Sequence, residues 1–228
     1  MLRIGIEINH VMRNLNRQLI KYYQKDIDPT LDDTEIDIRN EDVLNKYIKF
    51  KNKKAKNQFL TVDYAYEIFG CAKTSDNRLT EHFVQWQYDV TNYDKDDIEI
   101  VLFSMNEAEL TIQSTLFFLS KIGTRVRKIL FPKSVSEVEN ECDVVIASSD
   151  FLLDKLDPDL VTVVCIERGF NEGHRDNASL SYRSLTELFE DKTFLDKVYE
   201  YFYENTLYNN RENILSKWTR RIKRLFRG

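Results

Sequence analysis

The stretch Leu2-Arg-Ile-Gly-Ile-Glu-Ile-Asn9, continued by His-Val-Met-Arg-Asn14, decides the fold. Its first half is a short apolar run, interrupted by Arg3 and Glu7, and has the pattern of a buried β-strand. Polar residues follow directly, from Glu7 to Asn9. In open α/β sheets the residues just beyond the strand ends form the ligand crevice. We therefore expect the end of this strand to form part of a ligand site.

Four further runs with the same character lie between residues 98 and 166. They are short, apolar and rich in β-branched residues, and helical segments separate them. The predicted strands are 98–103, 128–131, 143–146 and 160–166, and the predicted helices are 107–121, 134–140 and 151–156. This alternation indicates a parallel sheet covered on both faces, a Rossmann-like three-layer α/β/α domain. The polar residues after the strands are 7–9, 104–106, 131–133 and 147–150.

The remaining segments predict an insertion and a C-terminal extension. A helix is expected over 11–24, and helices over 61–69 and 79–88 are assigned to a small module. Between them lie an acidic stretch, 26–42, and a lysine-rich stretch, 46–56. The predicted organisation has three parts: 1–25 with 96–192 as the core, 26–95 as the insertion, and 193–228 as a helical extension with a basic tail.

Composition limits the class of protein. The 228 residues are 42% hydrophobic and 12% aromatic, as in folded globular chains. Three widely spaced cysteines predict free thiols and a reducing compartment, either the cytoplasm or a virion assembled there. The N-terminus lacks the pattern of a signal peptide, and no apolar run approaches the roughly 20 residues of a membrane span.

In order and pattern, the motifs resemble those of haloacid dehalogenase-like hydrolases, and the first motif resembles the nucleotidase branch. Residues 3–14 resemble the first motif, in which an apolar strand leads into Asp-x-Asp-Gly. A strand that ends in Ser104 is similar to the second motif, and Lys133 to the lysine of the third. The segment 142–150 resembles the fourth, and the insertion occupies the place of the family's small cap.

The departures from these motifs predict a degenerate site. The resemblance assigns the nucleophile to Glu7 and the proton-transferring acid to Asn9. Glutamate is one methylene longer than aspartate, and a displacement of about 1 Å can lower a rate on the order of a hundredfold. An amide cannot transfer a proton at neutral pH. His10 replaces the usual glycine. The positions Glu7, Asn9, Ser104 and Lys133 are therefore expected to be vestigial and inactive.

The same positions leave two alternatives open for ligands. Glu7, the Asn9 carbonyl and Asp150 could hold Mg²⁺ weakly, although no cofactor is expected. Ser104 and Lys133 could bind a phosphate. Alternatively, Ser104 caps the helix that follows it and Lys133 is an ordinary surface lysine.

The C-terminus is basic, whereas the rest of the chain is acidic. Residues 217–228 carry six positive charges and no acid, so without them the net charge of −5 becomes −11. This amphipathic end could pack on its own domain, dock on a protein partner or a neighbouring copy, or bind nucleic acid or an anionic membrane surface. The residues expected to contact a partner are Trp218, Arg220, Arg221, Ile222, Arg224 and Phe226.

Two functional hypotheses follow. The first is a non-catalytic scaffold or assembly protein that binds protein partners, among them copies of itself or other virion proteins. Because the Lys-, Asn-, Asp- and Tyr-rich composition suggests an AT-rich genome, its specific form is a virion component of a tailed bacteriophage. The second is an atypical magnesium-dependent phosphohydrolase, of the 5′-nucleotidase type, or a nucleotide-binding protein. Asn9 separates the two hypotheses, because an enzyme of this type needs a second acid.

Overall fold

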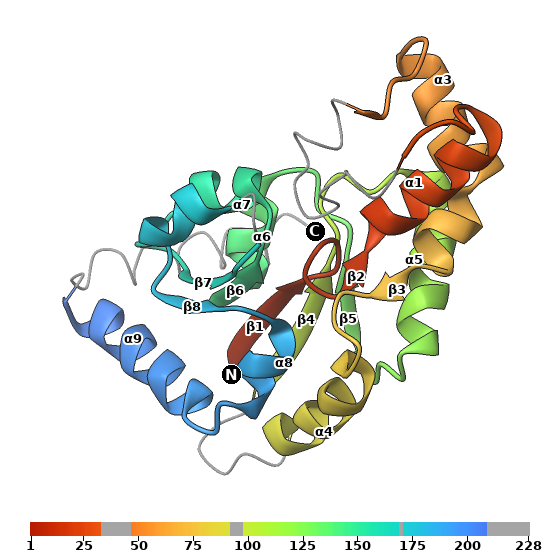
Figure 1. The fold of residues 1–228 in the computed structure, drawn as a ribbon. Coiled ribbons are helices and arrows are strands. Elements are labelled where there is room, and N and C mark those ends of the chain that lie inside the picture. Colours follow the sequence, from red (N-terminus) through yellow and green to blue (C-terminus); the bar gives the residue numbers. More distant parts are fainter. Residues whose placement is uncertain (33–46, 92–97, 169–170, 209–228) are drawn as a thin grey trace, which may run out of the picture.

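A six-stranded parallel sheet forms the centre of the protein (Figure 1). The computed structural model describes residues 1–32, 47–91, 98–168 and 171–208. The strand order is β5-β4-β1-β6-β7-β8. The strands are β1 (Leu2–Glu7), β4 (Ile98–Phe103), β5 (Lys128–Leu130), β6 (Val144–Ala147), β7 (Thr162–Ile166) and β8 (Leu180–Tyr182).

The N-terminal strand β1 lies in the interior of the sheet, between β4 and β6. Ile4 is in register with Ile100 on one side and with Val144 on the other. Ile4 and Ile6 are completely buried. A strand covered on both faces and paired on both edges needs apolar residues in succession, and this explains the apolar run that opens the chain.

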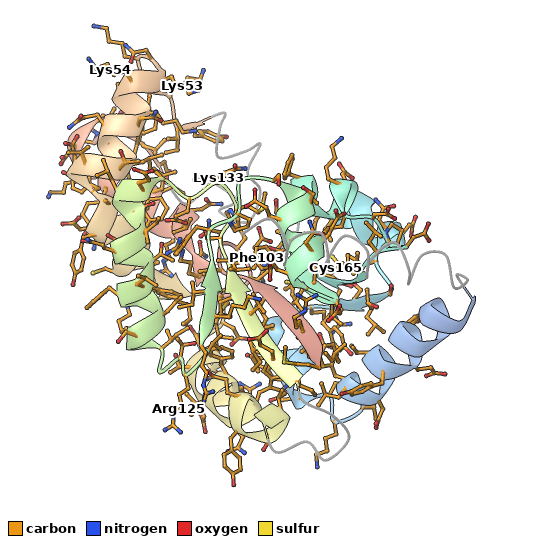
Figure 2. The ribbon with its side chains drawn as sticks, turned by 180° about the vertical axis from the view of Figure 1, so that it is seen from behind. Lys53, Lys54, Phe103, Arg125, Lys133 and Cys165 are labelled. Carbon is orange, nitrogen blue, oxygen red and sulfur yellow. The ribbon has the colours of Figure 1, made fainter. Side chains whose placement is uncertain are left out.

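Helices cover both faces of the sheet, so the domain has three layers. One face packs through Ile4, Ile6 and Ile146 against α4, α8 and α9. The other packs through Val145, Ala147 and Cys165 against α6 and α7. Figure 2 shows Phe103 and Cys165 within the strands, close to α6 and α7. The bounds are α4 (Leu79–Thr91), α5 (Glu109–Lys121), α6 (Val135–Glu141), α7 (Asp150–Lys155), α8 (Leu185–Glu190) and α9 (Phe194–Tyr208), with a 3-10 helix at Glu172–Asn177.

The insertion begins and ends at a two-stranded antiparallel ribbon of β2 (Arg13–Asn14) and β3 (Lys73–Thr74). Between them lie α1 (Leu15–Asp26), α3 (Lys53–Gln58) and two π-helical turns, Phe59–Asp63 and Tyr66–Gly70. These elements form a separate apolar cluster that includes Ile20, Tyr23, Phe59 and Ile68. In Figure 1 α1 and α3 lie at the upper right, away from the sheet.

Several local predictions differ from the structure. The predicted helix 11–24 begins only at Leu15, because Arg13 and Asn14 pair with β3 and the Asn14 side chain caps α1. The segment 61–69 is not one helix: it covers parts of the two π-helical turns and the two residues between them.

The packing also divides the chain differently from the predicted boundaries. The helix α1 packs with the insertion, whereas the helix predicted at 79–88 is α4 and packs on α8 and the main core. The strand β8 was not predicted. Of the predicted extension 193–228, the structure describes α9 up to residue 208; the proposed contact residues of the basic tail lie beyond it.

Among the described residues, no helix has both the length and the apolar character that a membrane crossing requires.

Gly5 provides a test of how closely the sheet packs. A Cβ atom at this position would lie 2.5 Å from the Sγ atom of the buried Cys142. We expect Gly5→Ala to lower the free energy of unfolding by about 1–3 kcal/mol, as overpacking does elsewhere. Urea denaturation followed by circular dichroism measures the change.

Two further variants distinguish a steric effect from a backbone effect. Cys142→Ala in the Gly5→Ala background should recover part of the loss, because it removes the clashing sulfur. Gly173→Ala, where no atom lies within 4 Å of the added Cβ, is the matched control. Equal losses from Gly5→Ala and Gly173→Ala would contradict the steric explanation.

Candidate functional site

The residues predicted for the site meet at the carboxyl edge of the sheet. The strand β1 ends at Glu7, β4 at Phe103 directly before Ser104, and β6 at Ala147 directly before Ser148. Because β1 lies between β4 and β6, these three strand ends are adjacent. The structure therefore brings together the first, second and fourth motif segments.

Glu7 is bound by the backbone of the neighbouring strand end. Its Oε2 atom accepts hydrogen bonds from the backbone N–H groups of Ser148 and Ser149, at 3.0 and 3.1 Å. The residue is only 3% exposed. One oxygen of this carboxylate therefore stabilises the turn that leads into α7.

Asn9 and Ser104 contact each other directly. The Asn9 amide donates to the Ser104 Oγ atom at 3.0 Å, and its Oδ1 atom accepts from Nε of Arg13 at 2.8 Å. The Ser104 hydroxyl in turn donates to the carboxylate of Glu107. Ser104 does not cap the next helix, since α5 begins at Glu109 with Ala108 as its N-cap. That alternative interpretation was wrong, because the hydroxyl is held by Glu107 instead.

Arg13 and Glu107 form a buried ion pair behind these two residues. The Nη2 atom of Arg13 lies 3.2 Å from Oε2 of Glu107, and both side chains are at most 1% exposed. The other oxygen of Glu107 accepts from the hydroxyls of Thr111 and Thr115, at 2.6 and 2.8 Å.

The same guanidinium group connects the insertion to the core. The Nη1 atom of Arg13 donates to the Phe69 carbonyl of the insertion at 3.2 Å and to Thr115 of α5 at 2.8 Å. Burial lowers the pKa of Arg13 to about 10, and the negative charge of Glu107 opposes this shift. Arg13 thus remains positively charged at neutral pH.

Lys133 also reaches this network from the third motif segment. Its Nζ atom donates to the backbone carbonyl of Glu107 at 2.7 Å, so it has a defined partner although the residue is exposed. Figure 2 shows Lys133 at the upper end of the strands. Lys133 precedes α6, which begins at Val135. Asp150 is the first residue of α7 and lies three residues beyond the end of β6.

A second group of contacts surrounds His10. The backbone of His10 has a positive φ of 63°, which the usual glycine would adopt more readily. Its carbonyl oxygen accepts from two nitrogen atoms of Arg168, at 3.2 and 2.9 Å. Asn171 connects the loop after β7 to the end of β6, because its side-chain amide donates to the carbonyl of Ser148 at 3.0 Å. Burial, Arg168 and Arg13 lower the pKa of His10 to about 4.

These contacts bear on whether the predicted Mg²⁺ ligands fit a metal. The Asn9 backbone carbonyl accepts from the Val11 N–H at 2.8 Å, and the Asn9 side-chain Oδ1 accepts from the Arg13 guanidinium group. Glu7 shares one oxygen with two backbone donors. Within the described ranges, no group of three or more His, Cys, Asp or Glu side chains could hold a metal ion. The donor set does not fit Mg²⁺ as it stands.

Sequence reasoning missed Arg13, Glu107, Thr115 and Arg168 as parts of this region. Arg13 gave one signal, since it is a charged residue that directly follows the apolar pair Val11-Met12. Glu107 gave none beyond its position as the first residue of a predicted helix. The two residues are separated by 94 positions, so only the parallel pairing of β1 with β4 brings them together.

Comparison with known proteins supports the architecture. No family model matches the chain, and no curated protein matches its sequence. Among solved structures, a protein from Burkholderia xenovorans LB400 that carries the designation haloacid dehalogenase-like hydrolase superimposes with a TM-score of 0.50. The match covers 84% of this chain and 96% of that one, at 11% identity. The chain has the haloacid dehalogenase-like fold. At this identity the likeness concerns the fold alone.

Within the haloacid dehalogenase-like fold, the network around Arg13 should be a major source of stability. Removing one member of a buried ion pair typically costs about 3–5 kcal/mol, because the other charge stays buried without its partner. We expect a loss of this size for Arg13→Met in chemical denaturation. In a double-mutant cycle with Glu107→Gln, the combined loss should be at least about 1 kcal/mol smaller than the sum of the single losses.

An exposed ion pair provides the control for this cycle. Arg78 and Glu190 lie 3.2 Å apart with side chains 62% and 46% exposed. Arg78→Met should change the free energy of unfolding by less than about 1 kcal/mol. Strictly additive losses for Arg13→Met and Glu107→Gln would show that the two side chains are not coupled.

The lowered pKa of His10 predicts a dependence of stability on pH. Between about pH 6.5 and pH 4 the unfolded chain binds a proton at His10 that the folded chain does not. The free energy of unfolding should therefore fall as the pH falls through this window. Asparagine tolerates positive φ, so His10→Asn preserves the backbone. Its stability between pH 7 and 5 should decline less than that of the native protein, by on the order of 1 kcal/mol. Identical profiles would contradict this assignment.

Proposed function

We propose that this protein is a non-catalytic scaffold that uses the haloacid dehalogenase-like fold to bind protein partners. The observation that carries the proposal is the buried Arg13–Glu107 pair and its bonds to Asn9 and Ser104. Asn9 and Ser104, which the resemblance assigns to chemistry, thereby belong to the hydrogen-bond network that holds the insertion against the core.

The charge distribution argues against phosphate at this edge. The Ser104 hydroxyl proton points to the Glu107 carboxylate, so it is not directed to an incoming anion. Arg13 is paired with Glu107, so the pair presents no unbalanced positive charge to a phosphate. Lys133, the remaining cation of the motif, is bonded to the backbone of Glu107.

Proton transfer has no evident carrier in the predicted place. The Asn9 amide cannot act as an acid or base at neutral pH. The Asn9 amide nitrogen donates to the Ser104 hydroxyl oxygen, and the Asn9 Oδ1 atom accepts from Arg13. The hydrogen bonds of Asn9 therefore favour a structural role for this residue over a role in proton transfer.

The specific form of the proposal is an assembly or virion component of a tailed bacteriophage. Its support is the composition, which is typical of an AT-rich genome, and the basic end from residue 217 to residue 228. In that role the partners are virion proteins or further copies of this chain.

The alternative is an atypical phosphohydrolase or nucleotide-binding protein. It is supported by the meeting of Glu7, Asn9 and Ser104 at adjacent strand ends. It would require Mg²⁺ in a donor set that is already engaged in hydrogen bonds.

Phosphate release distinguishes the two functions. We expect no magnesium-dependent release from an aryl phosphate or from nucleoside monophosphates above the rate of a Glu7→Ala variant. Asn9→Asp is the third variant, because it restores the missing acid at the same position. We expect it to be inactive as well, since Arg13 and Ser104 would bind the new carboxylate. Turnover in the native protein that disappears in Glu7→Ala would establish the phosphohydrolase instead.

A further inference from the structure

An open cavity lies in the insertion, between the end of α1, the segment before α3, α3 itself and the first π-helical turn. Its volume is about 640 Å³, and sites for small organic groups have volumes of roughly 300–1000 Å³. We call it the insertion pocket; three aromatic residues and two lysines contribute to its lining, namely Phe50, Phe59, Tyr64, Lys49 and Lys51. Its lining contains none of the residues at the carboxyl edge of the sheet, so it is a separate site.

The aromatic residues of the insertion pocket form one packed series. The ring centroids of Phe50 and Phe59 lie 5.3 Å apart, and those of Phe59 and Tyr64 lie 4.8 Å apart. Phe59 is buried, whereas Phe50 and Tyr64 are half-buried, so part of each of these two side chains is accessible. Because their neighbours already hold these rings, they can stack on a planar ligand with little further loss of side-chain freedom.

The segment that carries Lys49 and Phe50 is fixed to α1 by Tyr23. The Tyr23 hydroxyl donates to the Lys49 carbonyl at 2.8 Å and accepts from the Lys49 N–H at 3.1 Å. The Tyr23 ring also packs edge-on against Phe50, with centroids 5.4 Å apart. The backbone that places a lysine and an aromatic ring side by side at the insertion pocket is therefore preorganised.

Positive charge is concentrated around the insertion pocket. Five exposed lysines belong to the segment before α3 and to α3: Lys49, Lys51, Lys53, Lys54 and Lys56. Within the part of the chain that the structure describes, none of these five forms an ion pair. Figure 2 shows Lys53 and Lys54 projecting from the outer end of the insertion. The helix α1 and residues 47–64 together contain eight basic residues and only two acids, Asp26 and Asp63.

Both of these acids line the insertion pocket, and both already accept hydrogen bonds. The Tyr64 hydroxyl donates to Asp26, and the Gln58 amide donates to Asp63 at 2.9 Å. On the same side, the Lys25 ammonium lies 5.7 Å from the centroid of the Tyr64 ring. Charges beyond the Debye length, about 10 Å at 0.1 M salt, are largely screened. The local excess of lysines therefore determines that the pocket attracts anions, although the whole chain has a net charge of −5.

We propose that the insertion binds single-stranded nucleic acid, with an unpaired base in the insertion pocket and backbone phosphates on the surrounding lysines. Aromatic rings on which bases stack, next to cations that follow the backbone, are the means by which proteins bind single strands without sequence preference. A paired base of a duplex cannot enter the pocket. An acidic peptide or an anionic membrane would use the lysines but not the aromatic lining. Five lysines exceed the number that one phosphate group needs, so a strand fits better than a free nucleotide.

Fluorescence anisotropy of a labelled oligothymidine of about 20 nucleotides, titrated with the full chain at about 50 mM salt, tests the inference. We expect a Kd on the order of 10 µM that rises steeply with salt, because phosphate contacts release counterions. Lys49→Glu/Lys51→Glu should raise the Kd at least about tenfold. Phe50→Leu keeps an apolar side chain but removes a ring, and should raise the Kd about fivefold because a stacking partner of the base is lost.

Two control variants show where the strand binds. Lys155→Glu/Lys192→Glu makes the same change of net charge at exposed lysines outside the insertion, and should leave the Kd within about twofold. Arg220→Gln/Arg221→Gln/Arg224→Gln removes charge from the basic end and should leave the Kd within about threefold. Circular dichroism of every variant establishes that it is folded.

Four competitors show which anion is bound. A duplex of the same length, polyglutamate, vesicles that contain phosphatidylserine, and thymidine monophosphate should each displace the oligothymidine at least about tenfold less effectively at equal charge. Comparable displacement by any of them would overturn the inference and assign the site to that class of ligand. No binding at about 100 µM protein would also overturn it, and so would a loss confined to the variant of the basic end. The inference goes beyond the scaffold proposal, and phosphate release is not among its readouts, so the failure of either is distinguishable from the failure of the other.

Discussion

The structure depends on one buried ion pair, between Arg13 and Glu107. Two charges in an apolar interior must each find enough partners to replace water. Arg13 finds them in Glu107, Asn9, Thr115 and the Phe69 carbonyl. These groups come from the first loop, from the segment that leads into α5, from α5 itself and from the insertion. The hydrogen bonds of one guanidinium group therefore fix how these parts of the fold meet.

This constraint connects the fold to the proposed loss of chemistry. An insertion that acts as a moving lid must be able to separate from the core. Here the Phe69 carbonyl bonds to a charge that is itself buried, so opening the contact would expose an ion pair and leave buried donors without acceptors. The insertion is better suited to serve as a fixed surface. The close approach of Tyr66 and Phe117 extends that surface across the boundary with the core.

At the carboxyl edge of the sheet, the polar residues of the motifs bond to one another and to the backbone. Parallel strands bring their ends together whether or not a substrate is bound there, and polar residues at those ends must satisfy one another. Glu7 supports the turn into α7, and Asn171 ties the loop after β7 to the end of β6. The same geometry that can assemble a catalytic centre assembles a set of structural hydrogen bonds here.

The sequence by itself determined the class of fold and the strands that carry it. Apolar, β-branched runs that alternate with amphipathic segments are local patterns, and β1, β4, β6 and β7 follow them closely. The sequence also located Glu7, Asn9, Ser104 and Lys133 at the strand ends, because polar residues after a buried strand are visible without coordinates.

Only the tertiary structure decided what these residues contact. From sequence, Arg13 belongs to a predicted helix, whereas in the structure it pairs with β3. Glu107 is from sequence only an acid that opens a predicted helix. The short strand β8, the packing of α4 on the main core and the partners of Lys133 likewise depend on residues far away in the chain. The physical reason is that a buried charge is tolerated only where distant segments supply its partners, and local patterns contain no information about those segments.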